Sequence, residues 1–269
     1  MRVADSSATR KEFGPAVAGS RGPSAYRLVR IVTLIAARSH LIATAAFGAY
    51  DKSEHAYAQE LWAKVPGNSV ILLDRNFLAA KVLLALQGDP SRHWLLRTKS
   101  TTKWRVVKKL ANNDLIVELT VSKAARKQDP TLPETFQARA VSYRIDRRKT
   151  KQWLLASLMD PVRYPASELV VLDHERWEIE LSYDEIKTHQ LDRQETIRSR
   201  SVEGVKQERW GMLLTYNLIR REMECIADEA KVAPSRISFV AAMRFIRDEW
   251  HWCALAHSRE AKEDAREHP

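Results

Sequence analysis

Hydrophobic positions in the first ninety residues change period several times, and each change predicts a new element. Residues 26–35 are rich in β-branched side chains and partly alternating, and residues 41–47 repeat this character, which predicts a β-hairpin. From 54 to 65 apolar residues recur at helical spacing until Pro66 and Gly67 end the pattern, so a helix is predicted there. Residues 1–24 are rich in glycine, serine, proline and charge, and we expect an extended or looped start.

A continuous apolar run at 69–73 ends in a carboxylate, Asp74, and precedes a predicted helix at 78–87. Such a run is typical of a strand buried on both faces of a largely parallel sheet, and functional groups of such sheets lie at the carboxyl ends of strands. Asp74 is therefore a candidate site residue. Capping of the following turn or helix explains the same spacing equally well.

Beyond residue 92 the pattern changes to short strands separated by basic turns, predicted at 94–97, 115–119, 138–144 and 153–158. The loop 123–130 and the run 147–151 are strongly basic. One such run is commonly a solvated loop, but several together with Trp94, Trp104 and Trp153 favour a DNA-facing surface. After Pro161 the chain is predicted to be helical to Trp252, with breaks near 192–201 and at Pro234.

One predicted helix, 169–187, carries four charged residues on one stripe. At about 100° per residue they fall within about 60° of arc, beside an apolar stripe; the four are Asp173, Arg176, Glu180 and Lys187. In the simpler interpretation this is a solvated face with an i,i+4 ion pair. In the functional interpretation it faces a cleft in which Glu180 approaches Asp74 and shares a divalent cation.

Composition and charge narrow the possible partners. The 269 residues allow one large domain or two small ones, and 44 Lys and Arg against 34 Asp and Glu give a net charge of +10. This balance favours a polyanion, either nucleic acid or membrane phosphate. No apolar run approaches the ~20 residues of a membrane span, and no secretory signal is visible. The two cysteines cannot form a disulfide framework and favour a reducing compartment.

Paired carboxylates beside basic residues suggest phosphate chemistry. Mg²⁺ takes carboxylate oxygens and keeps positions open for phosphate oxygens, and two such ions can clamp an in-line displacement at phosphorus. Arg176 and Lys187 would hold phosphate and stabilise developing charge. A third carboxylate is expected to complete such a site.

The stretch 172–188 resembles the hallmark of the insertion-sequence-four family of DDE transposases, which is Tyr, two residues, Arg, three residues, Glu, six residues, Lys. Arg176, Glu180 and Lys187 match at these spacings, whereas Asp173 stands in the place of the Tyr. The segment 73–77 is similar to the region around the second catalytic Asp of the family. Further similarity covers 198–201 and 210–220, within a resemblance from about residue 3 to 249.

The resemblance implies an α/β fold with a ribonuclease-H-like core that lacks its first strand, a β-rich insertion and a helical C-terminal region. Residues 1–92 would form the N-terminal part of the core, and 93–160 mostly the insertion, whose last strand can rejoin the core. Residues 161–252 would form the helical part that carries the Glu and Lys signature, followed by a charged tail at 253–269. Trp177 and Tyr183 are assigned to packing.

The resemblance also implies metal-dependent cleavage and transfer of DNA strands during transposition. Asp74 and Glu180 would be the catalytic ligands of Mg²⁺ or Mn²⁺, and Arg176 and Lys187 would contact DNA phosphate. The implied partners are double-stranded DNA, at transposon ends and target, and a second copy of the chain in a homodimer. The implied location is the cytoplasm, in association with the nucleoid.

Departures from the family pattern bear on activity. The first catalytic Asp of the family precedes a segment similar to residues 2–6, so Asp5 is not assigned as a metal ligand, and we expect an N-terminally truncated chain that is inactive alone. Asp173 adds negative charge to the face expected to meet phosphate. The alternatives are an impaired transposase, a non-catalytic remnant that binds DNA or dimerises, and an unrelated basic nuclease that uses Asp74 and Glu180.

Overall fold

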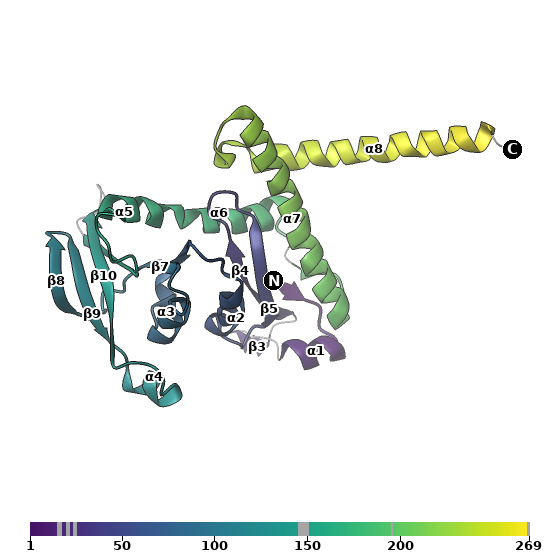
Figure 1. Cartoon of the computed structure of the whole chain (residues 1–269). Helices are drawn as coiled ribbons and strands as arrows, with labels where there is room; N and C mark the ends of the chain where they lie inside the picture. The colour runs from purple at the N-terminus through teal and green to yellow at the C-terminus, as the bar shows by residue number, and fades with distance from the viewer. Residues whose placement is uncertain (15–17, 20–21, 24–25, 145–150, 195, 268–269) are drawn as a thin grey trace.

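Two large β-sheets, a two-stranded sheet of β2 (Ala18–Gly19) and β3 (Gly22–Pro23), and a set of helices make up the structure. It is a computed structural model that describes residues 1–14, 18–19, 22–23, 26–144, 151–194 and 196–267. A four-stranded sheet has the order β12-β1-β4-β5, and a six-stranded sheet has the order β6-β7-β11-β10-β9-β8. Helices α5 and α6 lie end to end across both sheets, and α8 projects away from the body (Figure 1). No helix in the described part of the chain is long and apolar enough to cross a bilayer.

The four-stranded sheet is built on the predicted hairpin. Strands β4 (Arg27–Ile35) and β5 (Ile42–Ala49) pair antiparallel, which confirms the prediction. On the other side of β4, only its first two residues pair with β1 (Arg2–Val3). Strand β12 (Thr196–Ile197) pairs in parallel with β1 and so brings a late segment of the chain beside the first residues.

The six-stranded sheet begins with β6 (Ser69–Leu73), which pairs in parallel with β7 (Arg92–Arg97). The remaining strands are antiparallel, namely β11 (Lys151–Ala156), β10 (Thr135–Arg144), β9 (Asp114–Thr120) and β8 (Arg105–Ala111). The predicted strand at 69–73 is confirmed, but the expectation of a largely parallel sheet is wrong. The sheet crosses the proposed boundary at 92/93, and β11 pairs directly with β7.

Helices flank the sheets and join them. They are α1 (Ser7–Phe13), α2 (Glu54–Leu61), α3 (Ala80–Leu86), α4 (Lys123–Gln128), α5 (Ala166–Glu175), α6 (Trp177–Asp184), α7 (Val202–Ala230) and α8 (Phe239–Glu267). Short helical turns follow α2 at Trp62–Lys64, follow β6 at Arg75–Phe77, and precede α8 at Pro234–Arg236; a π-helix, Glu185–Gln190, continues α6. The helices predicted at 54–65 and 78–87 are confirmed.

Three elements differ from the sequence-based expectations. Helix α1 lies in the region expected to be extended, because Ser6 and Thr9 form a reciprocal capping box that satisfies the first backbone N–H groups. Helix α4 lies in the predicted basic loop, and the Ser122 hydroxyl accepts the Ala125 N–H to start it. Strand β8 was missed because it is exposed on both faces and shows no alternation. The basic run at 147–151 lies outside the described residues except for Lys151.

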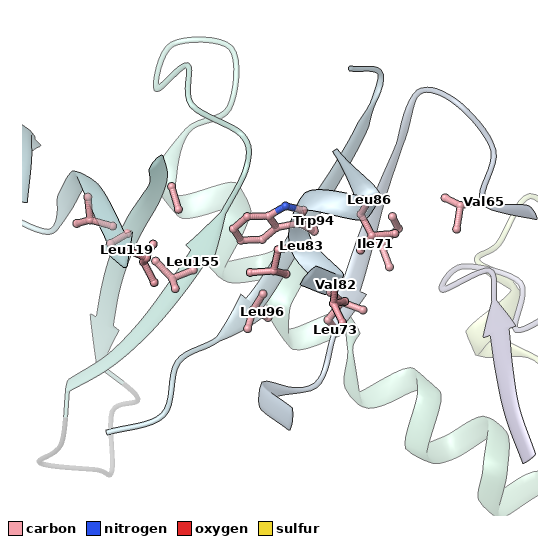
Figure 2. Packing of buried hydrophobic residues seen from close by; sticks show 13 residues of the cluster. Val65, Ile71, Leu73, Val82, Leu83, Leu86, Trp94, Leu96, Leu119 and Leu155 are labelled. Carbon is pink, nitrogen blue, oxygen red and sulfur yellow. The ribbon is translucent and has the colours of Figure 1, made fainter. Parts of the chain in front are cut away.

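The main core fills the space between the six-stranded sheet and α3. Trp94 lies at its centre among leucine and valine side chains from β6, β7, β9, β11 and α3 (Figure 2). Trp104 and Trp153 are partly buried and pack against this core and against each other, with their ring centroids 5.4 Å apart. The expectation that Trp94 faces DNA is therefore wrong, since burial of its large apolar surface dominates. Trp104 and Trp153 are only partly buried, and their contact with DNA stays a prediction.

A second core packs the buried face of α7 against the hairpin and the start of α8. Its fully buried members include Tyr216 and Met223, which lie seven residues apart on one face of α7. This packing fixes α7 beside the turn between β4 and β5, where Asn217 also bonds both backbone groups of Ile42. The hairpin and the C-terminal helices are thus one packed unit.

Candidate active site

Asp74 lies directly after β6 and has two local roles. Its backbone leaves the strand, and its carboxylate accepts the N–H of Asn76 at 2.9 Å, which starts the helical turn Arg75–Phe77. The capping role considered from the sequence is therefore present. The other carboxylate oxygen faces the helix α5–α6, and 47% of the side chain remains exposed.

Arg176 lies between the two candidate carboxylates. One guanidinium nitrogen is 3.3 Å from Glu180 Oε1 and 3.9 Å from Asp74 Oδ2. The Arg176 side chain is only 17% exposed, whereas that of Glu180 is 51% exposed. Because a single nitrogen contacts both, the two carboxylate oxygens lie no farther apart than the sum of these distances, and the structure brings Asp74, Arg176 and Glu180 together.

The helix that carries this charged stripe is not one regular α-helix. The N–H of Arg176 bonds the carbonyl of Asp173 at 3.3 Å, and the N–H of Ile179 bonds that of Arg176 at 3.2 Å, both with i→i−3 spacing. This tightening separates α5 from α6, and the chain then widens into the π-helix at Glu185. The uniform 100° rotation expected for 169–187 therefore fails, and the four charged residues do not share one face.

Asp173 is turned inward, away from the face expected to meet phosphate. It is 2% exposed, and its carboxylate binds the Arg97 guanidinium at 2.7 Å and the Tyr143 hydroxyl at 3.1 Å. Burial alone lowers the pKa of Arg97, but its bonds to Asp173 raise that pKa above its usual value. The expectation that Asp173 adds negative charge to the face that meets phosphate is wrong, because its carboxylate is buried and paired with Arg97.

Lys187 lies apart from the two carboxylates. Its ammonium is 5.8 Å from the ring centroid of Tyr183, and among the described residues no ion pair or hydrogen bond joins it to Asp74 or Glu180. Tyr183 is packed as expected, with its hydroxyl 2.7 Å from that of Thr33, and burial raises its pKa. Trp177, in contrast, is 58% exposed, so its assignment to packing is wrong.

A cavity of about 410 Å³ opens beside the carboxylates. Residues 32–37 of β4 and its end form one wall, residues 69–74 form another, and α2 and α5–α6 close the remaining sides. The lining is mainly apolar, with Asp74 and Arg176 among its few charged members. Asp74 is therefore positioned where two sheets and a helix meet, and Arg176 joins it to Glu180 outside the lining.

A buried polar network, which the sequence analysis does not predict, supports the helix that carries Glu180. His40, in the turn between β4 and β5, has a left-handed backbone with φ of 60° and is 3% exposed. Its Nε2 is 2.8 Å from a Glu178 carboxylate oxygen, and its Nδ1 contacts the guanidinium of Arg220. Arg220 also pairs with Glu185, which accepts a bond of 2.8 Å from the Tyr216 hydroxyl.

The network has a consequence for protonation. Desolvation opposes ionisation of Glu185, but bonds from His40 and Arg220 outweigh it and lower the pKa of this carboxyl. The i,i+4 spacing of Tyr216 and Arg220 on the apolar face of α7 was the available sequence signal. Polar residues on a buried stripe require partners, and outside α7 those partners come from two other elements, the turn that holds His40 and the π-helix that holds Glu185.

The donor groups near the cavity could provide part of a divalent-metal site. Asp74 and Glu180 supply the exposed carboxylate oxygens that a hard divalent cation prefers. Among the described residues no set of three or more His, Cys, Asp or Glu side chains is arranged to hold a metal ion. The described part of the chain therefore offers two carboxylates of a site, with a guanidinium between them.

Comparisons with known proteins identify the family of the chain. A family model for the transposase DDE domain matches residues 2–218. The chain is 36% identical over 220 residues to the transposase InsG for insertion sequence element IS4 of Escherichia coli (strain K12), a match that covers 81% of this chain and 49% of InsG. It is also 34% identical over 97 residues to the putative transposase InsZ of the same organism, covering 36% of this chain and 32% of that protein. The chain thus spans about half the length of InsG, and it belongs to the IS4 family of DDE transposases.

Proposed function

We propose that this chain is a DNA transposase of an insertion sequence and that it acts through metal-dependent cleavage and transfer of DNA strands. The observation that supports this most directly is the contact of Arg176 with both Asp74 and Glu180. Asp74 is distant in the sequence from the other two residues, and its segment is similar to the region around the second catalytic Asp of the family. Arg176 and Glu180 match the family hallmark. The net charge of +10 is suited to double-stranded DNA as the partner, and a homodimer and a cytoplasmic, nucleoid-associated location belong to the same proposal.

Each site residue has a role in this proposal. Asp74 and Glu180 would bind Mg²⁺ or Mn²⁺, which when bound polarises phosphate oxygens and activates the attacking hydroxyl or water. Arg176 now neutralises both carboxylates, and a bound cation would take over that function and release its guanidinium toward a DNA phosphate. Lys187, which is exposed on the π-helix, would contact phosphate farther from the carboxylates.

Catalysis by the chain alone is expected to be weak. Two carboxylates converge in the described residues, whereas a site that holds two cations normally has additional ligands. This observation also favours the second candidate function, a non-catalytic DNA-binding or dimerising protein. Both candidates are expected to bind DNA, but only the transposase is expected to cleave it.

We also propose that the core is ribonuclease-H-like, with a further strand in the space between the two large sheets. No strand pairing joins β4 to β6 within the described residues, yet both strands line the same cavity beside Asp74. One additional strand there would join the two sheets into the continuous sheet of a ribonuclease-H-like core. An experimental structure of InsG with a strand between the equivalents of β4 and β6 will support this proposal, and two separate sheets will contradict it.

Nicking of DNA tests the proposed activity. The purified chain is incubated with a supercoiled plasmid that carries both ends of its insertion sequence, with Mn²⁺ or Mg²⁺, beside Glu180→Gln as the matched variant. We expect slow conversion to nicked circles that requires metal and is lost in the variant. Metal-dependent DNA binding without any nicking would favour the non-catalytic candidate, and equal nicking by Glu180→Gln would contradict the site.

A further inference from the structure

A second cavity, of about 730 Å³, forms a basic groove next to the candidate site. Its walls are α2, the start of α3, the connection between β7 and β8, and the segment from the end of β9 into α4. Its polar lining includes Lys81, Lys99, Thr102 and Lys103. We call this cavity the lysine groove.

The lysine groove is strongly one-sided in charge. Three lysines line it, and no Asp or Glu does. All three are exposed, and none forms an ion pair with a described residue. Asp129 lies outside the lining but close enough for Lys81 to lower the pKa of its carboxyl, after the larger effect of bonds from Thr131. A net positive charge therefore remains inside a concave surface, which favours an anionic ligand.

Two of the lysines are held by a hydrogen-bonded turn. The backbone N–H of Lys99 bonds the Thr102 hydroxyl at 3.1 Å, and the Thr102 N–H bonds the Lys99 carbonyl at 3.0 Å. This turn fixes the backbone on which Lys99 and Lys103 project. The ammonium groups stay mobile on long side chains, which is suited to phosphate contact without a required base sequence.

The lysine groove is adjacent to the carboxylates through shared walls. Trp62 lines both the lysine groove and the cavity at Asp74. Phe77, which ends the turn that begins after Asp74, contacts Trp62 with ring centroids 6.4 Å apart and His55 with ring centroids 4.8 Å apart. A polymer bound at Asp74 can therefore continue past Phe77 into the lysine groove.

We propose that the lysine groove binds the sugar–phosphate backbone of double-stranded DNA next to the segment engaged by Asp74 and Glu180. This inference rests on the proposed function for its choice of DNA. Lys81, Lys99 and Lys103 each neutralise a phosphate, and the contact is independent of base sequence because ammonium groups on phosphates read no base edges. It adds affinity and orientation and takes no part in bond breaking.

Salt dependence measures this contact directly. Each neutralised phosphate contributes about −0.9 to the slope of log association constant against log salt concentration on duplex DNA. For the triple variant Lys81→Gln, Lys99→Gln, Lys103→Gln, we expect the slope to become shallower by about 2.7, and each single variant by about 0.9. Fluorescence anisotropy with a labelled 30-base-pair duplex across a NaCl series gives the slope.

A matched control removes the same charge elsewhere. Lys11→Gln, Lys231→Gln, Arg236→Gln also lowers the net charge by three, and all three residues are exposed and outside the lysine groove. Its slope is expected to stay near that of the parent chain. Unfolding midpoints of both triple variants confirm that exposed substitutions leave the fold intact, and the single variants serve if one triple variant fails to fold.

Two results would overturn the inference. If the salt slope becomes equally shallow in the groove variant and the control variant, only the overall charge of the chain matters. That result contradicts the lysine groove but leaves DNA binding by the chain intact. Absence of DNA binding by the parent chain overturns both the lysine groove and the choice of DNA. The carboxylate site is tested separately by nicking, so its failure is distinguishable from that of the lysine groove.

Discussion

Asp173 and Arg97 form a partly buried ion pair beneath the candidate site. Replacing Asp173 with Asn keeps the size of the side chain but leaves the Arg97 guanidinium and the Tyr143 hydroxyl without their charged acceptor. We expect a loss of about 1–3 kcal/mol in the free energy of unfolding, since removal of one partner exposes the desolvation penalty of the other. Urea unfolding measures it.

The control for this variant is Glu134→Gln. Glu134 also pairs with an arginine, Arg126, at 2.7 Å, but its side chain is 81% exposed. An exposed pair contributes about 0–1 kcal/mol, so the control is expected to change little. Equal effects of the two substitutions would contradict the structural role assigned to Asp173.

Asp5 gives the molecule a specific sensitivity to acid. Hydrogen bonds from Arg10, then from Arg27, lower the pKa of its carboxyl from 3.8 to about 2. Because the folded-state pKa lies below the unfolded one, the stabilisation is fully present above pH 3.8 and is lost as the pH falls toward 2. Asp5→Asn is expected to be less stable than the parent chain at pH 6 and equally stable near pH 2, in urea unfolding series at each pH. A constant difference across that range would contradict this assignment.

The variant Arg176→Gln distinguishes a functional role of Arg176 from a purely structural one. Both of its carboxylate partners are about half exposed, so Arg176→Gln is expected to change the free energy of unfolding by no more than about 1 kcal/mol. The same variant is expected to bind duplex DNA less tightly and to lose metal-dependent nicking. A large loss of stability with unchanged DNA affinity would show that Arg176 serves only the fold.

At the scale of elements, the turn between β4 and β5 is tied to α6 and α7 by His40. In His40→Ala, Glu178 and the buried Arg220 lose their shared partner, and we expect a destabilisation of about 2 kcal/mol, a size typical of hydrogen bonds to charged groups. Faster hydrogen exchange in the π-helix after α6 is expected at the same time. Exchange that changes uniformly over the chain would argue against a local role.

The elements predicted correctly are those with a clear hydrophobic period. The hairpin, α2 and α3 each bury one face, and β6 packs apolar side chains on both of its faces. Their side-chain patterns match this burial. Helices α1 and α4 have little apolar pattern and depend on serine caps at Ser6 and Ser122, which a reading of periodicity overlooks. Strand β8 depends on pairing with β9, because neither of its faces is buried.

At the scale of the whole molecule, two separate sheets meet at the cavity beside Asp74, and a helix pair covers that junction (Figure 1). The i,i+4 ion pair of Arg176 and Glu180 that the spacing predicts is confirmed. The structure adds that Arg176 also reaches Asp74, which lies on another element. Local spacing failed for Asp173, because helix tightening at Arg176 turned this residue toward Arg97. Regular rotation along a helix is an assumption that packing can override.

The amino-acid sequence by itself determined the α/β character, the positive charge, the strand that ends at Asp74, and the spacing of Arg176, Glu180 and Lys187, because these depend on residue type and on contacts within a few positions. Only the tertiary structure decided which charged side chains meet: Arg176 between two carboxylates, Asp173 beneath them on Arg97, and Lys187 apart on a π-helix. The burial of Trp94 and the one-sided charge of the lysine groove were decided there too. Such long-range contacts follow from the packing of whole elements, and local sequence carries little information about them.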